Sequence, residues 1–362
     1  MGNWRNGELG NFITLKRGFD LPQQKREDGQ VPIFSSSGIT GTHSTAMVNA
    51  PGVITGRYGT IGEVFYAAED FWPLNTTLFV EDFHGNDAEF IYYFLKTLEW
   101  SKFTSASAVP GINRNTVHKE TVSLPDIETQ RRIASTLSML DEKIKTNTEI
   151  NDNLQQQAAA LFSSLYDRSN TEVRFTDLIQ ILGGGTPKTG ENTYWNGNIA
   201  FFTPKDVGTP YTLITEKTIS KEGLSHCNSR LYPVNTVFVT ARGTVGKVGM
   251  SGVPMAMNQS CYALVGKETH QLLVYFYTLK AVDRLKHKAS GAVFDAITTR
   301  DFESEQIMKL SDDDATAFLR VAEPMFQEVL NNNIENLRLS TLRDSLLPKL
   351  MSGEIDVSDI QL

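Results

Sequence analysis

The chain repeats itself, and this internal repeat limits its possible folds more than any other feature. A block spanning about residues 18–166 recurs in the same order over about residues 184–350. The clearest match pairs residues 59–64 with 243–248, where a Gly-Thr-x-Gly segment follows an apolar run. An apolar run followed by glycines is typical of a strand that leads into a tight loop. We therefore expect two related globular parts.

Further matches follow this loop in the same order in both halves. They are residues 75–77 with 258–260, an aromatic helical segment at 90–95 with 273–279, and a small-residue loop at 105–111 with 289–292. Each half then ends in a long helical stretch. The predicted organisation is a globular domain at 1–125, a helix at 126–170, a second globular domain at 171–310, and a helix with a tail at 311–362.

The two helical stretches carry the pattern of a coiled coil. From Ile133, apolar residues recur at alternating steps of four and three, and the same pattern returns 185 residues later. The central seam positions are Leu140, Ile144, Asn147, Asn151 and Leu154 in the first helix, and Met325, Val329, Asn332, Asn336 and Leu339 in the second. Buried asparagines weaken a helix pair but fix its register, because a slipped pair leaves amides without partners. We expect an antiparallel pair whose asparagines meet near its centre.

Together these patterns predict an α+β protein in which an antiparallel coiled coil separates two duplicated domains with pseudo-twofold symmetry. A seam over residues 133–165 would span roughly 50 Å and could act as a spacer of fixed length. This symmetry matches two DNA half-sites that are about 34 Å or more apart. An interaction scaffold whose coiled coil only docks partners fits the same pattern equally well.

Composition excludes several classes of protein. No apolar run approaches the ~18 residues of a membrane span, and the start of the chain lacks a secretory signal, so we expect a cytoplasmic protein without a membrane partner. Cys227 and Cys261 are too few for a disulfide framework, and no metal-ligand spacing occurs, so no metal site is expected.

The net charge of −8 does not exclude a nucleic-acid partner. The acidic excess lies in the helical stretches and the tail, whereas the charges of the globular parts nearly cancel. Local basic surfaces can therefore still face phosphate. The one visible basic cluster comprises Lys280, Arg284, Lys286 and Lys288. A solvated helix face explains this cluster equally well.

No catalytic constellation is visible in the sequence. The glycine-rich segment at 183–190 invites a phosphate-loop interpretation, but Glu191 stands where that motif requires lysine. A turn after a strand at 179–182 explains the glycines better. An enzyme that binds a nucleotide at this loop remains a third and less favoured alternative. The free chain is expected to catalyse nothing.

The loops around the repeated glycine motif hold the best candidates for DNA contact. Arginine suits bidentate contact with guanine or phosphate, and amide and hydroxyl groups can read adenine or hold phosphate. The same groups can equally serve as turns and backbone caps. The candidates are Ser36, Ser37, His43, Arg57, Tyr58, Thr60, Asn75, Asn113, Arg114, Lys205, Arg242, Thr244, Lys247, Asn258, Gln259, Ser260, Lys288, Thr299 and Arg300.

Several segments resemble the DNA-specificity (S) subunits of Type I restriction-modification enzymes. The sequence from Leu342 to Ile355, LRDSLLPKLMSGEI, resembles the usual C-terminal end of these subunits. Residues 124–133 and 140–144 are similar to the family's first spacer helix. The Gly-Gly-Gly-Thr-Pro, Tyr-Trp-Asn-Gly and Phe-Thr-Pro-Lys-Asp segments between 183 and 206 resemble the opening of a target-recognition domain. The first domain departs from this form at residues 18–22.

The resemblance implies that each domain reads one half of a bipartite site in double-stranded DNA. It further implies that the two helices set the gap between the halves and bind two methylating (M) subunits. S-adenosylmethionine and the adenine chemistry would belong to those partners, so this chain itself would need no cofactor. Whether restriction (R) subunits also join is left open.

Overall fold

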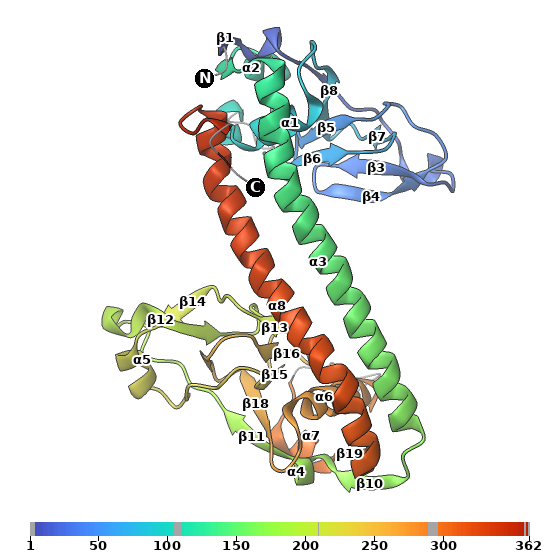
Figure 1. The fold of residues 1–362 in the computed structure, drawn as a ribbon, viewed down its shortest axis with the longest axis vertical. Coiled ribbons are helices and arrows are strands. Elements are labelled where there is room, and N and C mark those ends of the chain that lie inside the picture. The colour runs from blue at the N-terminus through green and yellow to red at the C-terminus, as the bar shows by residue number, and fades with distance from the viewer. Residues whose placement is uncertain (1–3, 105–109, 209, 289–295, 358–359, 361–362) are drawn as a thin grey trace. The chain divides into compact units, whose positions relative to one another are not determined.

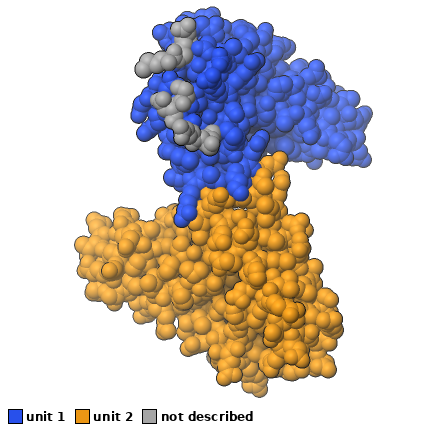
Figure 2. Space-filling model, viewed as in Figure 1, with its two compact units in different colours: residues 1–144, 338–362 blue, residues 145–337 orange. Residues whose placement is uncertain are grey.

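The structure is a computed structural model that describes residues 4–104, 110–208, 210–288, 296–357 and 360. The chain divides into two compact units (Figure 2). Unit 1 comprises residues 1–144 and 338–362, and unit 2 comprises residues 145–337. Each unit thus contains one globular part together with portions of both long helices. The predicted small-residue loops at 105–111 and 289–292 lie largely outside the described residues.

Unit 1 contains a four-stranded sheet of order β2-β8-β5-β6, a three-stranded sheet of order β4-β3-β7, and the pair β1-β9. Its strands are β1 (Arg5–Glu8), β2 (Thr14–Arg17), β3 (Val31–Ser35), β4 (Gly38–His43), β5 (Gly52–Gly56), β6 (Val64–Ala67), β7 (Trp72–Pro73), β8 (Thr77–Asp82) and β9 (Thr121–Leu124). Its helices, besides the long pair, are α1 (Ala88–Lys96) and α2 (Arg114–Val117), with short 3-10 turns at Leu9–Asn11, Gln23–Lys25 and Trp100–Phe103.

Unit 2 contains sheets of order β11-β18-β15-β16-β13 and β14-β12-β17, and the pair β10-β19. Its strands are β10 (Thr171–Arg174), β11 (Ile179–Gly183), β12 (Trp195–Phe202), β13 (Tyr211–Thr212), β14 (Lys217–Ile219), β15 (Val237–Thr240), β16 (Val248–Ser251), β17 (Met255–Met257), β18 (Cys261–Gly266) and β19 (Gln306–Lys309). Its shorter helices are α4 (Phe175–Leu178), α5 (Lys221–Ser225), α6 (Gln271–Lys288) and α7 (Thr299–Ser304), with a 3-10 turn at Asn192–Tyr194.

The two units repeat one another strand by strand, which confirms the predicted duplication. The order β11-β18-β15-β16 matches β2-β8-β5-β6, and the parallel pair β12-β17 matches the parallel pair β3-β7. The difference is β13, which adds to β16 in parallel in unit 2. This strand lies in a longer connection between β12 and β14, where unit 1 has the short β3-β4 turn.

Each larger sheet has a fully buried central strand, because its side chains are apolar or threonine on both faces. All residues of β5 and all residues of β15 are buried. A helix covers one face of each sheet: α1 buries Phe90, Ile91 and Phe94, and α6 buries Phe276 and Val282. The side chain of Asp87 accepts a hydrogen bond from the backbone N–H of Phe90 and so caps α1. The sheets therefore form rigid supports for the loops at their ends.

The long helices are α3 (Ile127–Asp167) and α8 (Asp312–Met351), and each is a single uninterrupted α-helix (Figure 1). Within unit 2 the amide of Asn147 donates to Asn336 at 2.9 Å, and that of Asn332 donates to Asn151 at 2.9 Å. The residue numbers of the pairs rise along α3 while they fall along α8, so the two helices run antiparallel, as predicted. Of the apolar seam residues, Leu140 and Val329 are buried and Ile144, Leu154, Met325 and Leu339 are half-buried.

The two units attach their globular parts to the helices by different chemistry. In unit 1, Tyr93 of α1 donates to Asp141 at 2.6 Å, and Arg343 of α8 pairs with the same carboxylate at 2.5 Å. In unit 2, Phe276 of α6 stacks on Phe162 of α3 and meets Phe318 of α8 edge-on, with ring centroids 4.9 and 5.2 Å apart. Among the described residues, no helix is long and apolar enough to cross a membrane.

Candidate nucleic-acid interface

The repeated Gly-Thr-x-Gly loop joins β5 to β6 in unit 1 and β15 to β16 in unit 2. Its first glycine has a φ of +78° at Gly59 and +82° at Gly243. This conformation strains any residue with a Cβ, which explains the repeated glycine. The following threonines, Thr60 and Thr244, are exposed. The loop therefore presents backbone and small polar groups at one end of each larger sheet.

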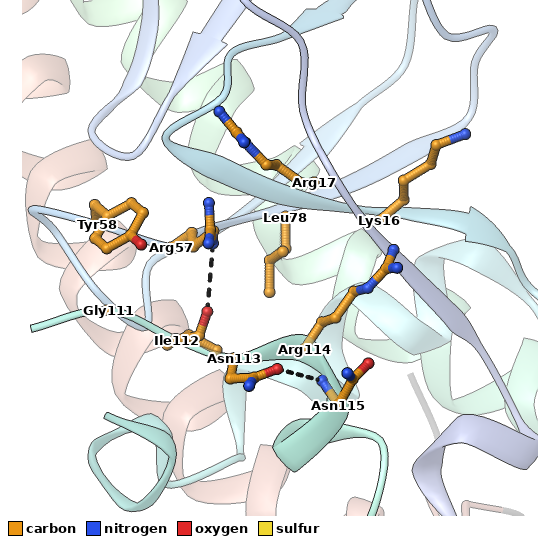
Figure 3. Close-up of a pocket in the computed structure, with 10 residues that line it drawn as sticks. All are labelled: Lys16, Arg17, Arg57, Tyr58, Leu78, Gly111, Ile112, Asn113, Arg114 and Asn115. Carbon is orange, nitrogen blue, oxygen red and sulfur yellow. Dashed lines mark hydrogen bonds between the residues drawn. The ribbon is translucent and has the colours of Figure 1, made fainter. Parts of the chain in front are cut away.

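In unit 1 this loop borders a cleft of about 640 Å³, here called the N-terminal cleft (Figure 3). The lining comes from β2, the start of the glycine loop, β8, and the first turn of α2 with the residues before it. The lining residues are Lys16, Arg17, Arg57, Tyr58, Leu78, Gly111, Ile112, Asn113, Arg114 and Asn115.

The N-terminal cleft is strongly cationic. Lys16, Arg17, Arg57 and Arg114 line it, and no carboxylate is among the described residues of its lining. Arg17 lies 3.7 Å from Asp20 in an exposed ion pair, and Lys16 pairs with Glu81. Exposed pairs of this kind are weak and open readily to an outside anion. The cleft is thus suited to a polyanionic ligand.

Unit 2 has a smaller cleft of about 450 Å³ beside its own glycine loop, here called the C-terminal cleft. Its lining residues are Thr203, Pro204, Lys205, Glu216, Lys217, Arg242, Gly243, Thr244, Asn258 and Ser260. Lys205 pairs with Glu216 at 3.6 Å, and the ammonium group of Lys217 lies 5.8 Å from the Trp195 ring centroid. This cleft is also cationic, but it contains one carboxylate.

The two arginines beside the glycine loops occupy different backbone positions. The N–H groups of Arg57 and Tyr58 both donate to the carbonyl of Thr76, whereas those of Ala241 and Arg242 both donate to the carbonyl of Ser260. The carbonyls of Arg57 and Ala241 in turn accept from Ile112 and Ile297. Arg57 is therefore the counterpart of Ala241, and Tyr58 is the counterpart of Arg242.

The structure brings nine of the predicted candidates into the two clefts. They are Arg57, Tyr58, Asn113 and Arg114 in unit 1, and Lys205, Arg242, Thr244, Asn258 and Ser260 in unit 2. Some of these polar groups also serve the fold. Asn113 caps α2 by accepting from the Asn115 N–H, and Asn258 accepts from the Ser260 N–H, both at 3.0 Å.

Other candidates lie outside the cleft linings. Ser36 and Ser37 form the turn between β3 and β4, and Thr60 and Lys247 are exposed near the glycine loops. Asn75 donates to Asp20, and Gln259 accepts from Thr186. Thr299 and Arg300 are exposed in the first turn of α7. That turn corresponds to the one in α2 where Arg114 and Asn115 line the N-terminal cleft.

The structure corrects one candidate, His43, and gives another, Lys288, a partner within the fold. His43 is only 5% exposed; its Nδ1 accepts from the Glu27 N–H at 3.0 Å, and its ring packs edge-on against Trp72. Its imidazole therefore serves the fold and is not offered to a ligand. Lys288 lies 2.5 Å from the carboxylate of Glu305, which is only 1% exposed. Lys288 neutralises this buried charge, while 61% of its own side chain stays exposed.

The basic cluster on α6 has mainly structural partners as well. Arg284 donates to the carbonyl of Gln306 at 2.6 Å and lies 3.9 Å from Glu305. Lys280 lies over the ring of Tyr166 at 5.2 Å from its centroid. Lys286 and Lys288 are exposed, so the cluster combines contacts to neighbouring elements with a solvated face.

Sequence reasoning missed several residues that line the clefts. They are Lys16, Arg17 and Asn115 in unit 1 and Glu216 and Lys217 in unit 2. The adjacent Lys16 and Arg17 just before Gly18 were a visible signal. Lys217 gave none, because only the pairing of β14 with β12 brings it near the glycine loop.

Among the described residues, no group of three or more His, Cys, Asp or Glu side chains could hold a metal ion. Burial raises the pKa of the Cys261 thiol to about 12, so this group stays protonated and unreactive at neutral pH. Both clefts present cations, amide or hydroxyl groups and backbone groups around an open hollow.

A family model, the Type I restriction modification DNA specificity domain, matches residues 1–156 and again residues 168–309. The HindI specificity subunit of a Type I restriction enzyme of Haemophilus influenzae is 25% identical over 355 residues, which covers 74% of this chain and 77% of the relative. The MjaIX specificity subunit of Methanocaldococcus jannaschii is 21% identical over 307 residues, covering 76% of this chain and 71% of the relative.

A solved structure has a similar fold. The S subunit of a Type I restriction-modification system from M. genitalium aligns with a TM-score of 0.69 and 16% sequence identity, over 96% of both chains. At this identity the likeness concerns the fold alone, and it extends through both globular parts and the long helices.

Proposed function

The chain belongs to the Type I restriction-modification DNA specificity family, and from this premise we propose that its two clefts are the surfaces that contact DNA. It is a DNA-recognition and assembly subunit, and the catalytic activity of these enzymes resides in partner subunits. The N-terminal and C-terminal clefts would each receive one half of a bipartite site.

The observation that carries this proposal is the repeated placement of a cationic cleft beside the same glycine loop in both units. Lysine and arginine bind phosphates and fix the register of a protein on DNA, and amide and hydroxyl groups read base edges. Each cleft supplies both kinds of group. An interaction scaffold without a DNA role gives no reason for a cationic cleft beside the glycine loop in both units.

We further propose that two methylating subunits bind this chain and that they hold the S-adenosylmethionine. The relatives are named as specificity subunits of Type I restriction enzymes, which supports a complex of several chains. The duplication of the chain supports two partners of one kind. The long helices would set the distance between the two half-sites.

A salt titration tests DNA contact by the N-terminal cleft. The chain, bound to its methylating partners, is titrated with duplex DNA at several salt concentrations, with Arg114→Ala as the cleft variant. Loss of one phosphate contact should reduce the slope of log affinity against log salt by about 0.9. Lys119→Ala is the matched control, because Lys119 is an exposed cation just beyond α2 that does not line the cleft. Equal slopes for both variants and the unaltered chain would contradict DNA contact by this cleft.

A further inference from the structure

The two clefts differ at the arginine beside the glycine loop, and we propose that Arg57 reads a guanine base whereas Arg242 contacts a DNA phosphate. This inference rests on the proposed DNA contact by both clefts and assigns the two arginines different roles. Its basis is the one-residue difference in position between them and the surroundings that follow from it.

At both sites two successive N–H groups donate to one carbonyl, the arrangement of a β-bulge, which re-aims side chains next to a functional site. In unit 1 the two bulge residues are Arg57 and Tyr58, and both line the cleft. In unit 2 they are Ala241 and Arg242, and only the arginine lines the cleft. Arg57 therefore has an aromatic neighbour at the bulge, whereas Arg242 has a buried methyl group.

Arg57 is held in one orientation from two sides. Its guanidinium carbon lies 4.5 Å from the centroid of the Tyr58 ring, and its Nε donates to the Ile112 carbonyl at 3.4 Å (Figure 3). The two terminal nitrogens have no partner within the described part of the chain. They form the planar fork that matches the O6 and N7 acceptors of guanine. A fork fixed before binding loses little freedom on contact, and this favours the discrimination of bases.

The aromatic support of Arg57 is itself fixed by a glycine. A Cβ added at Gly111 would lie 2.2 Å from Cε1 of Tyr58, so any larger residue would displace the ring. Gly111 and Tyr58 also form a β-bridge. Gly111 thus makes room for the Tyr58 ring, and the ring orients Arg57. Tyr58 is a positioning residue in this scheme.

Arg242 lacks this support. Its side chain is exposed, and within the described residues no aromatic ring lies in cation–π contact with it. An exposed cation without such support can bind a phosphate but does not present a fixed fork to a base edge. The position that Tyr58 fills in unit 1 is therefore occupied by a charge that adds affinity without selecting sequence.

Exchange of each arginine for lysine separates the two roles, because lysine keeps the charge and removes the planar fork. The complex with the methylating partners is titrated with a duplex carrying the motif read from the host methylome, with duplexes changed one base pair at a time, and with an unrelated duplex. Arg57→Lys should lose discrimination at one G·C pair of one half-site, on the order of tenfold or more. Arg242→Lys should keep discrimination at every position.

Two variants of Tyr58 test the positioning role without altering Arg57. Tyr58→Phe keeps the ring and should discriminate as the unaltered chain does. Tyr58→Leu removes the ring and should lose discrimination at the same G·C pair as Arg57→Lys, with unchanged affinity for the unrelated duplex. Thermal unfolding of each variant checks that the fold is retained.

The inference is overturned if Arg57→Lys discriminates as well as the unaltered chain, or if Arg57→Lys and Arg242→Lys lower discrimination alike. Loss of discrimination in Tyr58→Phe would assign base contact to the hydroxyl and also remove the positioning role. Failure of the proposed function looks different: the unaltered complex itself would then bind the motif duplex and the unrelated duplex equally.

Discussion

At the scale of single residues, His118 connects two walls of the N-terminal cleft. Its Nε2 accepts a hydrogen bond from the Leu15 N–H at 2.9 Å, and Arg114 donates to the Leu15 carbonyl at 3.4 Å. Leu15 lies in β2, Arg114 begins α2, and His118 directly follows α2. The two hydrogen bonds to Leu15 therefore join the two cationic walls of the cleft. Only a neutral ring nitrogen can accept the bond. Burial, followed by the nearby charge of Arg114, lowers the pKa of His118.

This hydrogen bond predicts that unit 1 loses stability in mild acid. The pKa of His118 is lower in the folded than in the unfolded chain, where it is about 6.5, so the unfolded chain binds more protons in this range. The contribution is fully present above about pH 6.5 and is lost as the pH falls below that value. His118→Gln offers an oxygen acceptor at every pH. Its melting temperature should therefore fall less than that of the unaltered chain between pH 7.5 and 5.5, and equal falls would refute the role of the ring.

The residues of the clefts were predictable only in part from the sequence. The glycines of the repeated loop and the arginines beside them were visible, because their spacing recurs in both halves. The roles of His43 and Lys288 were not, because burial and the partner Glu305 depend on contacts distant in sequence. The non-equivalence of Arg57 and Arg242 was also hidden, since it appears only in the backbone hydrogen bonds.

At the scale of elements, the polar layer in the middle of the helix pair is more extensive than the seam pattern indicates. Besides the two direct asparagine pairs, Asn151 donates to Asn333 at 3.0 Å and Asn147 donates to Glu335 at 2.7 Å. Asn147, Asn151 and Asn332 are each at most 5% exposed. Buried amides of this kind fix register at a cost in stability.

A double-mutant cycle on Asn151 and Asn332 measures what the buried amide pair costs in stability. Asn332→Leu leaves the buried Oδ1 of Asn151 without its partner, and this variant, like Asn151→Leu, should lower the free energy of unfolding by about 1–3 kcal/mol. The double variant Asn151→Leu/Asn332→Leu should unfold with a free energy at or above that of the unaltered chain, because both polar groups are gone. Denaturant unfolding gives both values.

Asn153→Ala is the control for this cycle, since Asn153 is an exposed asparagine on the same helix. Its effect should stay within about 0.5 kcal/mol. Additive losses in the double variant would mean that the two buried amides do not act as a pair.

The elements themselves were largely predictable where the signal was periodic. The seam predicted the long helices and their antiparallel pairing, because heptad spacing and the asparagine positions are local features of sequence. The strand orders of the sheets were not predictable, because they arise from pairing between distant segments. The extra strand β13 illustrates this. Tyr211 and Thr212 pair with Met250 and Ser251, and no pattern in the sequence predicts that pairing.

At the scale of the whole molecule, the helices are expected to set the gap between the half-sites. Duplicating one facing heptad in each helix adds about 10 Å, or roughly three base pairs of duplex. The recognised motif should keep both halves and gain about three unspecified positions between them. Replacing the same heptads without changing their length is the control. An unchanged gap in the lengthened chain would show that the helices do not measure it.

The most direct test of DNA recognition by this chain is the genome-wide adenine methylation of its host, mapped with the chain present, deleted, and carrying a replaced segment 1–125 or 171–310. We predict that deletion removes one split motif, and that each replacement changes one half of that motif and leaves the other intact. A methylome that is unchanged on deletion, with the methylating partner expressed, would contradict the recognition role.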